Sequence, residues 1–283
     1  MKVVALVALS LAITTSVVST FSFGNSEPEW DDLRVTWGPN VLTKYKPQPR
    51  TQQDAVNHGF RLVGSTTCDG TGVYNGFAYV KDNDYSVTLL YDKNGYIAGI
   101  QHGITKEQAE KAGYPSKKLQ PPFVYTDGRL VLTAYFTDPS KICTEGRTQA
   151  QFNTEGTGTN LWIQTGNTPS QVTLIPRQQS ALSTTKWVDG KCFITMGEHY
   201  WYNIKPDMDC DTFFPVFLLY NGGKLNAFGW AFLADLESPN YEHPSISVLG
   251  AFIQQVPTCI SKITHPISTM HIYLTSTPLL DAC

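Results

Sequence analysis

The stretches Val87-Thr-Leu-Leu-Tyr91 and Val216-Phe-Leu-Leu-Tyr220 share one pattern, and this pattern decides how the fold is interpreted. Each is followed by a turn that contains glycine and asparagine and then by a second apolar run, which is typical of a β-hairpin. Pro49-Arg-Thr-Gln-Gln53 lies upstream of the first stretch, and Pro176-Arg-Gln-Gln179 lies upstream of the second. Because these matches occur in the same order, they predict an internal repeat.

Further segments extend the repeat. Val131–Phe136 resembles Val248–Ile253, and both are expected to be strands that follow the hairpin of their unit. Leu33–Trp37 and Leu161–Thr165 have the pattern of a common opening strand, and His271–Thr275 resembles a third copy. We expect this last strand to complete the second unit as Leu161–Thr165 completes the first, so that the two units share an edge.

The rest of the chain also has a β pattern, with short runs of β-branched and aromatic residues bounded by Gly, Pro, Asn or Asp. The fold class expected is all-β, with two tandem, internally duplicated antiparallel β-sandwich or β-barrel domains and one short helix. The helix is predicted at Lys106–Ala112, where Thr105 can cap its first turn. The expected domains are residues 25–148 and 160–283, joined by a linker at 149–159.

Residues 1–24 have a basic start, a short apolar core and small residues after it, which together predict a signal peptide. The apolar run is too short for a membrane span, so we expect a secreted, extracellular protein. The net charge is −3 and no basic stripe occurs, which argues against nucleic acid as a partner. The oligomeric state cannot be read from these features.

All six cysteines lie after the signal segment, as expected in an oxidising compartment. The repeat alignment matches Cys68 with Cys192 and Cys143 with Cys259. The predicted disulfides are therefore Cys68–Cys143, Cys192–Cys259 and Cys210–Cys283, all of them structural.

No histidine matches another across the repeat, which argues against a metal site shared by both units. The histidines of the second unit remain candidate ligands for a metal site confined to that unit. A site made of His243, His265, Met270 and His271 would suit copper, since imidazole and thioether ligands favour it. Convergence of three residues from this set and His199 would favour a metalloenzyme.

Two acidic turns precede the matched strands and are candidate calcium sites, because alternating carboxylates can supply hard oxygen ligands. The residues are Asp82, Asp84, Asp207, Asp209 and Asp211. The EF-hand pattern is not present, and turn formation is the alternative explanation for these residues.

Aromatic side chains crowd the second unit, and those that face outward could bind a small molecule or a glycan. The candidate residues are Tyr200, Tyr202, Trp230 and His102. No common catalytic motif is present, so no catalytic residue is assigned. The expected function is that of a secreted binding or extracellular-matrix protein, without a required cofactor. The alternative is a secreted enzyme of an uncommon type, such as a copper-dependent or oxygen-using oxidoreductase.

Overall fold

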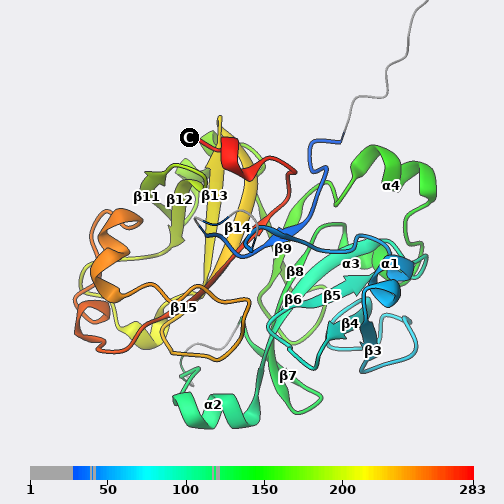
Figure 1. Cartoon of the computed structure of the whole chain (residues 1–283), viewed down its shortest axis with the longest axis horizontal. Helices are drawn as coiled ribbons and strands as arrows, with labels where there is room; N and C mark the ends of the chain where they lie inside the picture. Colours follow the sequence, from blue (N-terminus) through cyan, green and yellow to red (C-terminus); the bar gives the residue numbers. More distant parts are fainter. Residues whose placement is uncertain (1–27, 39, 41–42, 117, 119–121) are drawn as a thin grey trace, which may run out of the picture.

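The computed structural model describes residues 28–38, 40, 43–116, 118 and 122–283, so the predicted signal peptide at 1–24 lies outside the described residues. The first sheet lies on the right of Figure 1 and has eight strands, all paired antiparallel. Its strands follow the order β10 (Val172–Ile175), β9 (Leu161–Gln164), β8 (Arg129–Tyr135), β6 (Ile97–Thr105), β5 (Thr88–Tyr91), β4 (Phe77–Lys81) and β3 (Phe60–Val63), with β7 (Val124–Thr126) also paired to β8.

The second sheet lies on the left of Figure 1 and has seven antiparallel strands. Their order is β11 (Trp187–Phe193), β12 (Gly197–Tyr202), β13 (Val216–Asn221), β14 (Lys224–Phe232), β15 (Ser268–Tyr273), β1 (Arg34–Val35) and β2 (Lys46–Pro47). The prediction of an antiparallel all-β fold is confirmed. The described strands of each sheet form an open path, so the barrel alternative is not supported.

One hydrophobic core lies between the sheets and contains residues of both. Phe136 after β8 packs against Phe228 of β14 with ring centroids 6.3 Å apart. The indole N–H of Trp30 donates a hydrogen bond to the carbonyl of Leu225, 3.0 Å away. Smaller clusters cover the outer face of each sheet. The sheets therefore pack as the two layers of a sandwich around a shared core.

The two sheets have matching strand orders, and each sheet contains two strands from the other predicted domain. β9 and β10 fall in the predicted second domain, yet β9 pairs with β8 of the first sheet. β1 and β2 fall in the predicted first domain, yet β1 pairs with β15 of the second sheet. The division into domains 25–148 and 160–283 stays a prediction, and strand pairing crosses it in both directions.

Hydrogen bonds at the two matched hairpins are the same. The hydroxyl of Tyr91 donates to the carbonyl of Pro49 at 2.7 Å, and that of Tyr220 donates to the carbonyl of Pro176 at 2.6 Å. The ladder register also shifts at both tyrosines. The Pro-Arg segments and the hairpins that the sequence pattern paired therefore meet in the same way in each sheet.

The expected strand at Val248–Ile253 is wrong, because residues 246–251 form a 3-10 helix, η4. The strand that follows the second hairpin in the sheet is β15, at Ser268–Tyr273. Val248–Ile253 is short and apolar, and periodicity alone cannot separate a buried strand from a helical turn in such a run.

More helices form than the one that was predicted. The helix α2 (Lys106–Ala112) has the expected capping box at Thr105. Three further α-helices are α1 (Gln52–Asn57), α3 (Pro139–Ile142) and α4 (Gln149–Glu155), so α4 occupies most of the predicted linker. Among the described residues, further 3-10 helices are η2 (Gln179–Thr184), η3 (Cys210–Thr212), η5 (Ile260–Lys262) and η6 (Pro278–Leu280).

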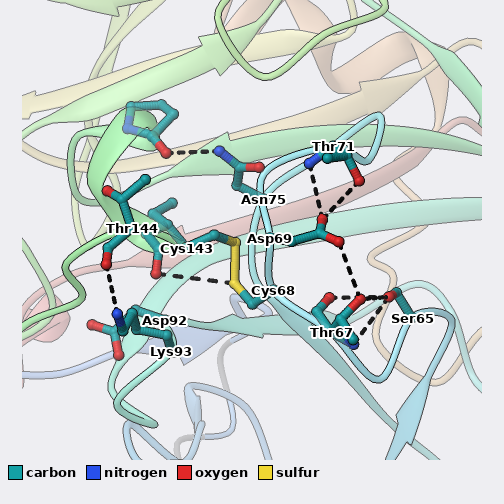
Figure 2. The surroundings of a disulfide bond; sticks show 12 residues. Ser65, Thr67, Cys68, Asp69, Thr71, Asn75, Asp92, Lys93, Cys143 and Thr144 are labelled. Atoms are coloured by element: carbon teal, nitrogen blue, oxygen red, sulfur yellow. Dashed lines mark hydrogen bonds between the residues drawn. A yellow bond between two sulfur atoms is a disulfide. The ribbon is translucent and has the colours of Figure 1, made fainter.

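Three disulfides join the six cysteines, but only one of the predicted pairs is present. Cys68–Cys143 forms as expected, and Figure 2 shows it beside the Lys93 ammonium, which donates to the carbonyl of Thr144. The predicted pairs Cys192–Cys259 and Cys210–Cys283 are wrong: the bonds are Cys192–Cys283 and Cys210–Cys259. Since β15 takes the place of β8, the cysteine that follows β15 is the partner of Cys192.

Three disulfides are consistent with an extracellular, disulfide-rich protein. Within the described ranges, no helix is long and apolar enough to cross a membrane.

Candidate functional site

A mostly apolar cavity of about 580 Å³ lies on the outer face of the second sheet, and we call it the aromatic pocket. Its walls come from β11, β12, β13 and β15, from η4, and from the segments around residues 37 and 241–244. Six aromatic residues line it: Trp37, Phe193, Trp201, Phe217, Tyr241 and Phe252. Polar lining residues are Lys44, His199, Glu242, His243, Thr269 and His271. Its size and composition are those of a small-molecule site.

Strand alternation aims these side chains into the pocket. On β12, His199 and Trp201 point to the outer face, whereas Tyr200 between them points toward the other sheet. On β15, His271 faces the pocket, and Met270 belongs to the core between the sheets.

Glu242 is held at one wall of the pocket by β15 and by the chain after β1. Its backbone N–H and C=O pair with those of Thr269. Its carboxylate accepts the backbone N–H of Trp37 at 2.6 Å and the hydroxyl of Thr269 at 2.8 Å. These bonds fix the carboxylate 3.2 Å from Nδ1 of His271.

The two imidazoles of the pocket are buried but have different surroundings. Nδ1 of His199 lies 3.0 Å from the carbonyl oxygen of Lys191, and burial together with the nearby His271 lowers its pKa to about 3. His199 is therefore neutral at ordinary pH. His271 is only 6% exposed, and among the described residues neither of its ring nitrogens makes a hydrogen bond. The ring centroids of the two histidines are 6.3 Å apart.

The equivalent position on the first sheet carries a different pair of residues. There, Gln101 pairs with Thr133 across β6 and β8, and its side chain donates to the Thr133 hydroxyl at 2.9 Å. In the second sheet the corresponding pair is Gly229 and His271. A Cβ on Gly229 would lie 2.1 Å from a ring carbon of Phe217, so the glycine makes room for that ring.

Of the four predicted copper ligands, His243 and His271 line the same pocket, and the other two lie elsewhere. His243 lines the pocket and pairs with Asp235 at 3.2 Å, whereas His265 is exposed. Met270 lies in the core on the opposite side of β15 from His271. Within the described residues, the one group of three close ligand atoms is Cys192, Glu198 and Cys283, and those two cysteines form a disulfide.

The acidic residues proposed for calcium lie at two turns of the chain, and those with side-chain partners contact groups from distant segments as well as from their own turn. Asp84 accepts hydrogen bonds from the Ser238 hydroxyl at 2.7 Å and the Asn240 amide at 3.1 Å, beside a polar hollow of about 1030 Å³. Asp82 is exposed at the same turn, and Asp207 is exposed at the other. Asp209 caps η3, and Asp209 and Asp211 lie 2.7 and 3.6 Å from the Lys118 ammonium.

The four residues proposed for ligand binding lie outside the aromatic pocket. Tyr200 packs on Tyr220, and Tyr202 packs on Trp187. Trp230 is fully buried in the core. His102 is also buried between the sheets, stacked on Phe232 and 3.2 Å from the Tyr241 hydroxyl, and burial lowers its pKa to about 4.

Sequence reasoning named His199, His243 and His271 of the residues that line the pocket, as possible metal ligands, and missed the others. Glu242 and Phe252 lie in irregular segments, where no periodicity marks a buried side chain. Alternation in the sequence places Trp201 on the opposite face of its strand from Tyr200 and Tyr202, but it does not show which face is the core.

Comparison of the chain with protein-family models, with curated proteins and with solved structures finds no match.

Proposed function

We propose that this chain is a secreted binding protein that holds a small, mostly apolar molecule in the aromatic pocket. The observation that carries the proposal is the pocket itself, a cavity of about 580 Å³ lined mostly by aromatic and other apolar residues, with a few polar residues among them. Such rings supply apolar contact area, and the polar groups orient a ligand. The signal-peptide pattern and the three disulfides support export.

We also infer that the two halves arose by duplication and that the binding site belongs to the second sheet alone. Matching strand orders and the matching tyrosine hydrogen bonds support the duplication. The change from the Gln101–Thr133 pair to the Gly229–His271 pair supports a site specific to the second sheet.

The test uses N-phenyl-1-naphthylamine, a neutral apolar dye whose fluorescence rises in an apolar site. We expect saturable binding with one dye per chain. Ala251 lines the pocket at the end of η4, so Ala251→Trp should fill the cavity and weaken dye binding by at least about tenfold.

Ser247→Trp is the matched control, because Ser247 is exposed on the same 3-10 helix and does not line the cavity. Thermal unfolding of both variants verifies that they fold. A wild-type protein that binds no dye, or equal binding by the two variants, would contradict the proposed function.

A further inference from the structure

His271 is the least satisfied polar group at the wall of the aromatic pocket. Its two ring nitrogens are buried: Nδ1 lies 3.2 Å from the Glu242 carboxylate, and Nε2 has no partner within the described part of the chain. Leaving a buried polar atom without a partner costs free energy, and a ligand that supplies the partner recovers it. We propose that the ligand of the aromatic pocket is an apolar molecule with one hydroxyl group, which hydrogen bonds to the His271 ring; this inference rests on the proposed function.

A hydroxyl group suits His271 in either of its protonation states. Nδ1 faces the Glu242 carboxylate at 3.2 Å, so a neutral ring with its proton on Nδ1 presents Nε2 as an acceptor. A charged ring presents Nε2–H as a donor. A hydroxyl can donate to the first and accept from the second, whereas an ether or a ketone can only accept.

The charges around His271 select against ionised ligands. A carboxylate ligand would meet the Glu242 carboxylate, which already accepts bonds from Trp37 and Thr269. An ammonium ligand would meet Lys44, which lines the same cavity. The apolar walls also disfavour a charge that lacks a full set of partners.

The experiment compares naphthalene with 2-naphthol by calorimetric titration of the full chain. The two probes have the same apolar body and differ by one hydroxyl. One added hydrogen bond to a buried group predicts that 2-naphthol binds about tenfold more tightly. 2-Naphthoate and 2-naphthylmethylamine, which carry the two charges, are expected to bind more weakly than 2-naphthol.

His271→Leu should reduce the ratio of the two affinities to about one while naphthalene affinity stays within about threefold. His243→Leu is the matched control, because His243 lines the same cavity but is exposed, so water can satisfy its ring and the ratio should stay near ten. His271→Phe, which keeps a ring of similar shape without a hydrogen-bonding atom, serves as a second variant if His271→Leu does not fold.

Several results would overturn the hydroxyl assignment while the proposed function stands. These are equal wild-type affinities for naphthalene and 2-naphthol, tightest binding of the amine, or a ratio that does not change in either His271 variant. A stoichiometric metal in the wild-type protein that is lost in His271→Leu would also overturn it. If none of the four probes binds, the proposed function itself fails.

Discussion

The disulfide Cys192–Cys283 can be tested by removing it as a pair. The Cys192→Ala/Cys283→Ala variant should lose one bond and expose no thiol, because both partners are replaced. The bond closes a loop with a sequence separation of 91 residues, for which the chain-entropy model gives about 4–5 kcal/mol at 25 °C. That is a large part of the stability of a typical domain, so the urea midpoint should fall strongly.

The matched variant is Cys192→Ala/Cys259→Ala, which follows the pairing expected from sequence. Because it breaks two bonds, it should leave Cys210 and Cys283 without their partners and titrate with two thiols per denatured chain. Thiol titration in denaturant and mass-spectrometric mapping of non-reduced peptides distinguish the two arrangements. The reasoning is refuted if the first variant shows two thiols, the second shows none, and mapping links Cys192 to Cys259.

Three further predictions concern the free energy of unfolding in urea. Burial raises the pKa of Asp281 from 3.8 to about 6, so the folded chain binds this proton more tightly than the unfolded chain. The free energy of unfolding should therefore fall by about 1–2 kcal/mol as the pH rises from about 4 to about 6, and Asp281→Asn should remove that part of the pH dependence. Gly229→Ala should cost about 2–3 kcal/mol, because its Cβ would meet a ring on β13 and a carbonyl on β15, whereas Gly250→Ala, with open space around it, should change stability by less than about 0.5 kcal/mol; equal effects would contradict the packing argument. Tyr91→Phe and Tyr220→Phe should each cost about 1–2 kcal/mol, and a difference above about 1 kcal/mol would argue against equivalent roles.

Local patterns predicted the strands well where turns and alternation mark them. The hairpins at Val87–Tyr91 and Val216–Tyr220 and the capped helix at Lys106–Ala112 are examples. The misplaced strand at Val248–Ile253 has a local cause, because a short apolar run is compatible with a 3-10 turn as well as a strand. That one error changed the disulfide prediction, because it matched Cys143 with Cys259 and not with Cys283.

The candidate site was harder to predict because its residues meet only through tertiary structure. Trp37 and Glu242 are far apart in sequence, yet they are joined by a 2.6 Å hydrogen bond. Alternation placed Tyr200 and Trp201 on opposite faces of β12 but could not decide which face the other sheet covers. The prediction that function lies where the halves differ named His243 and His271, which line the aromatic pocket, together with His265 and Met270, which do not.

The strand exchange between β8–β9 and β15–β1 has a consequence for assembly. If the halves are repeats, each supplies its first two strands to the sheet of the other, as subunits do in a domain-swapped dimer. A half-length chain would have no partner for those strands and would expose the edge of its last strand. Such a chain should complete its sheet only by pairing with a second copy about a two-fold axis, and a duplicated chain would be the covalently joined form of that homodimer.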